Sequence, residues 1–167
     1  ENLKTIKTIG ETKIITSENY IIDGDNITFD DLNKYIGSKN KTIITDQDKN
    51  VIYLNNFEYL ISDFIFKSVG EIKVEDNFKN TYNFSQIYID TKKKELLGTD
   101  NKTYINKKDF KIDSRNDPRI FSNVVTMDKR ITSFGKSNFT LCGYRKDDKC
   151  PPWSILSETM LHDKKKK

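Results

Sequence analysis

The sequence predicts an all-β fold in which antiparallel hairpins are stacked along the chain. Three observations support this prediction. Ile, Val, Tyr, Phe and Thr alternate with polar residues over short segments, which is the period of a strand with one buried face. Clusters of residues typical of turns separate these segments at intervals of roughly ten residues. The one segment that resembles a helix, residues 27–37, is rich in Ile, Thr and Phe and is better read as a strand and a turn.

The alternating segments, read in chain order, are the expected strands. They lie at residues 4–16, 25–30, 41–45, 50–54, 57–61, 71–76, 86–90, 102–105, 110–113, 123–128, 138–141 and 153–156. The expected turns lie at residues 23–26, 38–41, 46–50, 55–57, 91–94, 98–101 and 113–118. Short strands with such connections are typical of antiparallel meanders.

A weak repeat gives the hairpins a common form. The shared pattern is an apolar residue, any residue, an apolar residue, Asp, a short polar turn, further apolar residues and then Gly. It occurs at residues 26–37, 86–98 and 123–135, and a degenerate copy lies at residues 57–70. From Asp to Gly the spacing is 37−30=7, 98−90=8 and 135−128=7 residues. We expect each Asp to bond turn amides and each Gly to permit a bulge or a close backbone approach. The Asp-to-Asp intervals of 60, 38 and 35 residues are irregular, which favours stacked hairpins with variable loops over a strict solenoid.

One face of the expected strands carries a continuous series of apolar side chains, which we call the apolar stripe. If the hairpins stack in register, Thr28, Glu58, Tyr88 and Thr126 face the other way. The stripe is either the core of a closed sandwich or the lining of a groove that opens to an apolar ligand, because both need the same alternation. Its residues are Ile27, Phe29, Phe57, Tyr59, Ile61, Ile87, Ile89, Val125 and Met127.

Length and charge restrict the class of protein. At 167 residues a single domain is expected. The 29 basic and 25 acidic residues leave a net charge of only +4, and four lysines form the terminal run, so no binding to nucleic acid is expected. No apolar run approaches the ~20 residues of a membrane helix. Because no signal peptide precedes Glu1, we expect the sequence to start after a cleaved signal or at a boundary in a longer chain.

A catalytic or metal site is not expected. His162 is the only histidine, and no nucleophile elbow, phosphate loop or zinc-protease motif accompanies it. Cys142, Cys150 and His162 are three soft ligands, whereas structural zinc takes four, usually with short Cys-x-x-Cys spacings. We therefore predict a protein that is not an enzyme and that needs no cofactor.

The segment from residue 142 to residue 163 is the most specific part of the sequence. It holds both cysteines, the only Trp, the only His and two of the three prolines. A disulfide between Cys142 and Cys150 would tie a loop between consecutive strands and contribute about 2 to 3 kcal/mol. Two free cysteines in a reducing compartment fit the spacing equally well, so the residues alone leave both alternatives open.

This segment resembles the one that closes the periplasmic N-terminal, OstA-like domain of the LPS-assembly outer-membrane proteins, the LptD or organic solvent tolerance family, in its alphaproteobacterial form. The hairpins upstream are similar to that domain in style only, and Ser157 stands where the family usually has Ala. The residues that carry the resemblance are Cys142, Cys150, Pro151, Pro152, Trp153, Ile155, Ser157, Leu161, His162 and Asp163.

The resemblance implies an open antiparallel β-jellyroll, in which two sheets form a V-shaped groove lined by the apolar stripe and closed at its end by Trp153 and Ile155. Such a groove would receive the lipid A acyl chains of lipopolysaccharide and pass them to a transmembrane barrel. Residues 1–167 would form one domain at the periplasmic face of the outer membrane of a Gram-negative bacterium, with residues 142–167 as the junction toward the barrel.

The resemblance also implies partners. A periplasmic bridge protein would pair by β-augmentation with the N-terminal edge, which runs from Leu3 to Thr16, and an outer-membrane lipoprotein would plug the barrel. In the family, cysteines of this domain can also bond to cysteines beyond the barrel. Two alternatives stay open, namely a soluble or inner-membrane-anchored bridge component of the same transport system and a closed β-sandwich adhesin or carbohydrate-binding module.

Overall fold

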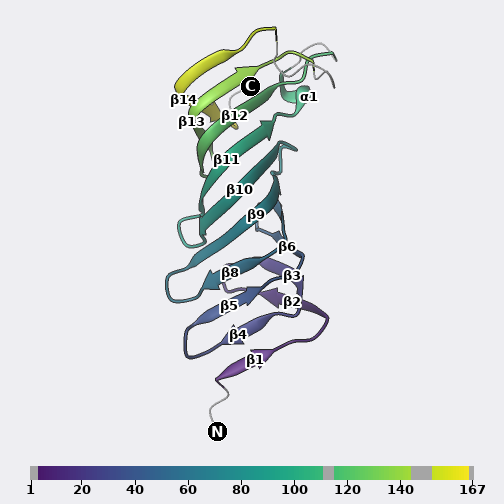
Figure 1. Ribbon diagram of the computed structural model, residues 1–167, viewed down its shortest axis with the longest axis vertical. Helices are drawn as coiled ribbons and strands as arrows, with labels where there is room; N and C mark the ends of the chain where they lie inside the picture. Colours follow the sequence, from purple (N-terminus) through teal and green to yellow (C-terminus); the bar gives the residue numbers. More distant parts are fainter. Residues whose placement is uncertain (1–3, 111–114, 144–151, 166–167) are drawn as a thin grey trace.

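The protein is an elongated stack of antiparallel strands, seen here in a computed structural model that describes residues 4–110, 115–143 and 152–165 (Figure 1). These residues form fourteen strands and one short helix, α1 (Lys107–Phe110). Every strand pairs antiparallel with its neighbours, and the sheet does not close on itself, because β1 and β14 lie at its opposite ends. The fold is therefore all-β and has the arrangement of an open β-jellyroll, as predicted.

The first eight strands are short and form two rows, and the chain passes from one row to the other after every second strand. Within a row, each strand is hydrogen-bonded to the next. The first row contains β2 (Glu11–Ile15), β3 (Ile21–Asp25), β6 (Thr42–Thr45) and β7 (Val51–Leu54). The second row contains β1 (Thr5–Lys7), β4 (Thr28–Asp30), β5 (Tyr35–Ser38) and β8 (Phe57–Leu60).

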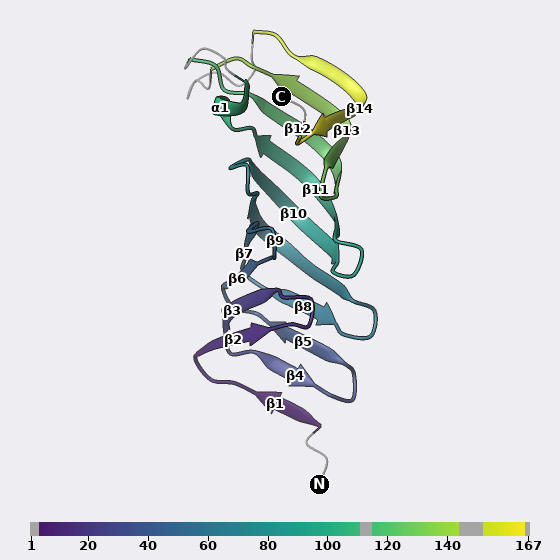
Figure 2. The same cartoon turned by 180° about the vertical axis from the view of Figure 1, so that it is seen from behind.

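The later strands are long enough to continue both rows. The first residues of β9 (Ile65–Glu75) pair with β8 and its last residues pair with β7. The strand bends at Gly70, whose φ of 115° is easily reached only by glycine, and its register with β10 shifts between Phe84 and Gln86. The long strands that follow are β10 (Thr81–Asp90), β11 (Glu95–Tyr104), β12 (Arg119–Met127), β13 (Ile131–Thr140) and β14 (Ile155–Asp163). Figure 2 shows β6 and β7 beside β9 from the other side.

The hairpins repeat with a period of 30 residues up to β11. Asp46 and Asp76 begin equivalent turns 76−46=30 residues apart, and Asp30 and Asp90 are 90−30=60 residues apart with one further turn between them. The later intervals of 38 and 35 residues are larger because longer connections follow β11 and β13. The repeat is thus regular, and the irregular intervals predicted from the sequence come from these two connections.

Two predicted turns are wrong. Residues 23–26 and 98–101 were expected to be turns, but Asp23 to Asp25 belong to β3 and residues 98–101 lie inside β11. Strand neighbours on both sides pair with Asp23 and Gly24 in β3 and with Gly98 and Thr99 in β11, which outweighs the local turn preference of Asp, Asn and Gly. Of the strand expected at residues 110–113, Phe110 ends α1 and the other residues lie outside the described part.

The core lies along the inner side of the two rows. Among the described residues, Tyr82, Phe57 and Phe134 are the largest side chains with less than 2% of their surface exposed. The rings of Phe57 and Phe66 stack with their centroids 5.4 Å apart. Burial of each such side chain contributes about 1.5 to 3 kcal/mol, so the stack is held together along its whole length.

Candidate functional site

The structure brings most of the predicted apolar stripe together in the core. Within it, Ile61 and Met127 are partly buried and pack against the fully buried members. Phe29 is half-buried in β4, whereas Trp153 and Ile155 are 46% and 52% exposed. The six stripe residues that are fully buried are Ile27, Phe57, Tyr59, Ile87, Ile89 and Val125.

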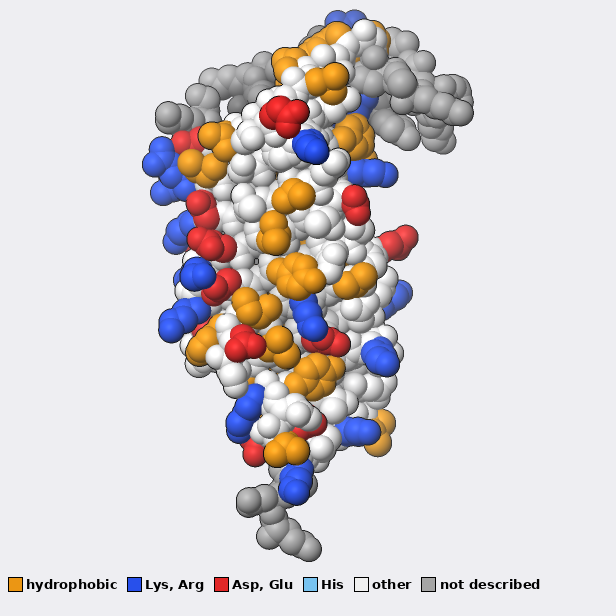
Figure 3. Space-filling model, turned by 60° about the vertical axis from the view of Figure 1, so that its left-hand side comes forward, with side chains coloured by type: hydrophobic (Ala, Val, Ile, Leu, Met, Phe, Trp, Pro, Cys, Tyr) orange, Lys and Arg blue, Asp and Glu red, His pale blue; other side chains and the backbone are white. Residues whose placement is uncertain are grey.

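The alternation of sides is confirmed by the outward neighbours of the stripe. Glu58 and Thr126 are exposed, Tyr88 is 38% exposed and Thr28 is half-buried. Hydrophobic side chains are also spread over the face turned to the reader in Figure 3, while charged side chains follow one another along its left edge. Periodicity therefore predicted correctly which side chains face inward in β8, β10 and β12, whereas Thr28 and Phe29 in β4 are both half-buried and Ile155 in β14 is exposed.

The apolar interior reaches the surface in a cleft between the turns of the two rows, which we call the mouth cleft. Its volume is about 180 Å³. Turns of the first row at residues 16–20, 46–50 and 76–80 form its first lip. Turns of the second row at residues 91–94 and 128–130, with residues 163–165 after β14, form its second lip. The apolar floor between the lips consists of Tyr20, Ile52, Val74, Ile89, Leu96 and Met127.

Among the described residues, the lips contact each other through two pairs of polar side chains. Lys94 Nζ donates a hydrogen bond to Gln47 Oε1 over 3.0 Å, and Lys129 Nζ lies 3.5 Å from Asp48 Oδ1. The amide of Gln47 is oriented for this contact because its Nε2 donates to the carbonyl of Glu18. Exposed pairs of this kind contribute at most about 1 kcal/mol each, so the two lips are joined weakly.

The first lip is built around a buried carboxylate. Asp76 is only 3% exposed, and its Oδ1 accepts hydrogen bonds from the backbone amides of Phe78 and Asn80. Its Oδ2 accepts from Asn80 Nδ2 and from the hydroxyl of Tyr82, whose pKa is raised by burial. Asn80 Oδ1 in turn accepts from the backbone amide of Asn106, which connects this turn to the next one along the lip.

The repeated aspartates of the second row bond turn amides with their side chains, as predicted. Asp90 accepts hydrogen bonds from the amides of Lys92 and Lys93, and Asp30 makes the equivalent contacts in the β4–β5 turn. The bonds donated by the turn amides hold the pKa of each of these carboxyls below its ordinary value.

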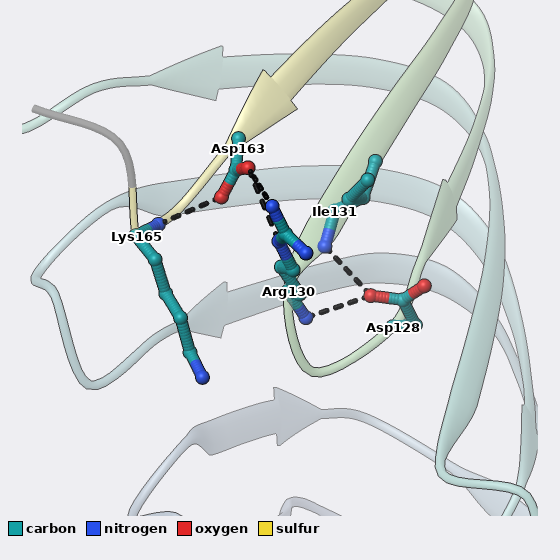
Figure 4. A network of polar contacts seen from close by, with 5 residues as sticks. All are labelled: Asp128, Arg130, Ile131, Asp163 and Lys165. Carbon is teal, nitrogen blue, oxygen red and sulfur yellow. Dashed lines mark hydrogen bonds and ion pairs between the residues drawn. The ribbon is translucent and has the colours of Figure 1, made fainter.

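At the end of the second lip, Asp128 and Asp163 lie side by side, and each accepts hydrogen bonds from backbone amides that follow it in the chain (Figure 4). Asp128 accepts from the amides of Arg130 and Ile131, which lowers its pKa. Asp163 accepts from the amide of Lys165, and its other oxygen pairs with the guanidinium of Arg130 at 2.9 Å. The end of β14 is therefore fastened to the β12–β13 turn, which places Lys164 in the mouth cleft.

A separate apolar void of about 20 Å³ lies beside the mouth cleft. It shares Tyr20 and Ile89 with the cleft and is also lined by Ile22, Ile44 and Phe66. Burial raises the pKa of Tyr20 to about 12, so its hydroxyl stays neutral. A larger hollow of about 940 Å³ lies near the bend at Gly70, but it is open and is lined by several lysines, so it offers less apolar enclosure.

The predicted disulfide falls partly outside the described residues, because Cys150 and Pro151 are among those that the structure does not describe. Cys142 follows β13, and its backbone amide donates a hydrogen bond to the hydroxyl of Thr140 over 3.1 Å. Thr140 Oγ1 donates to the carbonyl of Trp153, which brings the start of the terminal segment to the end of β13.

Searches for a metal site and a membrane helix gave no candidate among the described residues. No group of three or more His, Cys, Asp or Glu side chains in this part of the chain is arranged to hold a metal ion. The helix found there, α1, is neither long nor apolar enough to cross a membrane.

Sequence reasoning missed the polar residues of the lips. The signal was present in the turns that begin at Asp46 and Asp76, which share the form Asp-x-x-Lys-Asn and lie 30 residues apart. Nothing in the sequence, however, places Gln47 opposite Lys94, because that contact depends on how the two rows approach each other.

Comparison with known proteins gives no further guidance. No protein-family model matches the chain, and a search of curated proteins finds no match either.

Proposed function

We propose that this chain is a non-catalytic lipid conduit, the periplasmic domain of an LPS-assembly protein of the outer membrane. The observation that carries the proposal is the mouth cleft, where a continuous apolar interior meets the surface between two weakly joined lips. Each acyl methylene moved from water onto such a floor contributes about 0.8 kcal/mol, so a lipid with several chains could bind there without any chemistry being done on it.

The open ends of the sheet fit a role in a chain of transport proteins. In the described part of the chain, β1 pairs only with β4 and β2 only with β3, so both rows present an unpaired strand edge at the N-terminal end there. We propose that a periplasmic bridge protein adds its strands there, within Leu3 to Thr16, and that lipopolysaccharide then moves along the stack toward an outer-membrane barrel with its lipoprotein partner.

Photo-crosslinking tests this function. A photoreactive amino acid at Ile89 or Met127, both on the cleft floor, should capture lipopolysaccharide in cells, whereas the same group at the outward neighbours Tyr88 and Thr126 should not. Capture only at the outward positions would contradict the proposal.

A closed β-sandwich binding module is the second candidate, and the full burial of Ile87, Val125 and Phe134 favours it. Such a module would not exchange lipid through the mouth cleft. An apolar dye that gains fluorescence with the wild-type protein, and loses it when lipopolysaccharide is added, would count against a closed core.

A further inference from the structure

The lysines of the second lip are not all in ion pairs, although Asp46, Asp48, Asp76 and Asp128 also line the cleft. Lys94 donates to the uncharged amide oxygen of Gln47, and Lys164 Nζ donates to the backbone carbonyl of Asp128 over 3.2 Å. Among the ion pairs of the described residues, none includes Lys94 or Lys164. Desolvation lowers the pKa of Lys164, the expected effect of holding an ammonium group in a cleft without an anion in contact.

The aspartates around the cleft are already engaged. Asp76 accepts four hydrogen bonds within its own lip, and Asp128 accepts two from turn amides. Asp48 is the carboxylate that reaches across to the second lip, where it lies 3.5 Å from Lys129. Both cross-lip contacts therefore use a lysine that an incoming anion could bind in place of Gln47 or Asp48.

The cleft is also narrow while these contacts persist, with a volume of about 180 Å³. A longer apolar chain can lie on the floor only if the lips move apart. Removal of Lys94 from Gln47 and of Lys129 from Asp48 would break the two contacts that join them.

We propose that Lys94, Lys129 and Lys164 bind the anionic, phosphate-type headgroup of an amphiphile whose tail lies on the cleft floor, and that this anion opens the mouth by replacing Gln47 and Asp48. The inference rests on the proposed lipid conduit. It adds a binding site for the headgroup and the displacement of Gln47 and Asp48 that lets the tail enter. When no ligand is bound, the first lip occupies Lys94 and Lys129, and the carbonyl of Asp128 in the second lip accepts a hydrogen bond from Lys164.

Calorimetric titration with two amphiphiles tests the site. Dodecyl phosphate is anionic and dodecyl maltoside is neutral, and each is used below its micelle concentration with the whole chain. Replacing Lys94 and Lys164 by Gln should weaken binding of dodecyl phosphate about tenfold or more, because charge-assisted hydrogen bonds are lost, and should not weaken binding of dodecyl maltoside, because the loss of Lys94 only loosens the mouth. The matched control replaces Lys41 and Lys102, which line the outer hollow, and changes the net charge equally.

The outcomes separate the headgroup site from the conduit. Unchanged dodecyl phosphate binding in the Lys94→Gln, Lys164→Gln protein, or an equal loss in the control, would overturn the headgroup site while lipid capture at Ile89 still supported the conduit. Inorganic phosphate that binds as tightly as dodecyl phosphate would also overturn it, since the tail would then be irrelevant. Failure of both amphiphiles to bind, together with no capture at Ile89, would overturn the conduit itself.

Discussion

The two lips of the mouth cleft follow the same plan but are stiffened by different means. Along the first lip, side-chain amides connect successive turns, as Asn50 Oδ1 accepts from the amide of Asn77 and Asn80 Oδ1 from that of Asn106. Along the second lip, backbone groups do so, as the amide of Thr91 donates to the carbonyl of Phe64. Across the mouth, the contacts between lips are two exposed side-chain pairs. The difference shows that hydrogen bonds connect successive turns within each lip, whereas the contacts between the two lips are the weakest of these connections.

The largest expected effect comes from the centre of the first lip. Asp76→Ala removes the acceptor of four hydrogen bonds and leaves the Tyr82 hydroxyl and the Asn80 amide buried without it. The free energy of unfolding should fall by about 3 to 5 kcal/mol, measured by urea denaturation. Asp90→Ala, in the equivalent but exposed turn of the second lip, should cost clearly less, and equal losses would refute the contrast between the lips.

A smaller effect is expected behind the lips, where strands approach closely. A Cβ at Gly98 would lie 2.5 Å from the ring of Phe84, whereas a Cβ at Gly135 would have its nearest neighbour at 3.7 Å. Gly98→Ala should therefore destabilise the fold by about 1 to 3 kcal/mol, while Gly135→Ala should change its stability by less than ~0.5 kcal/mol. Thermal unfolding of both variants checks this, and a larger loss at Gly135 would contradict the packing described here.

Acid should weaken the turns of the second row through their aspartates. The pKa values of Asp30, Asp90 and Asp128 are below the ordinary value of 3.8, so their contribution is present above the unfolded-state pKa and is lost as the pH falls through the folded-state pKa. Urea midpoints should therefore drop below about pH 4. The triple variant Asp30→Asn, Asp90→Asn, Asp128→Asn should show a shallower drop, and an unchanged pH dependence would rule out this origin.

The smallest change in stability is expected at the joint between the lips. Lys94→Ala together with Lys129→Ala should lower the free energy of unfolding by no more than about 1 kcal/mol. The same change should speed the reaction of a maleimide with a cysteine placed at Ile89, in a background where Cys142 and Cys150 are Ser. A loss of several kcal/mol, or an unchanged reaction rate, would show that the lips are not joined in this way.

The sequence predicted the hairpins and the inward faces, because both depend on local pattern. Turns begin at Asp30, Asp90 and Asp128 because each carboxylate accepts hydrogen bonds from the amides of its own turn. This local bonding does not depend on where the hairpin lies in the stack. Ile87 and Val125 are inward because a strand alternates sides with a period of two.

The features that it did not predict depend on contacts between distant segments. Residues 98–101 continue β11 because β12 pairs with them, although their composition favours a turn. Gln47 and Lys94 are 47 residues apart and meet only when the two rows approach each other. The exposure of Trp153 and Ile155 likewise follows from their place at the open end of the sheet beside β13, which no periodicity encodes.

The most direct test of whether the mouth cleft opens is to cross-link its two lips covalently. Gln47→Cys and Lys94→Cys, joined by a short bismaleimide in the background with Cys142 and Cys150 replaced by Ser, would hold the lips at their closed separation. Lipopolysaccharide capture by a photoreactive group at Ile89 is then compared between the joined protein and the same protein before joining. We predict that capture is lost on joining, whereas equal capture in both states would show that lipid does not enter the interior through the mouth cleft.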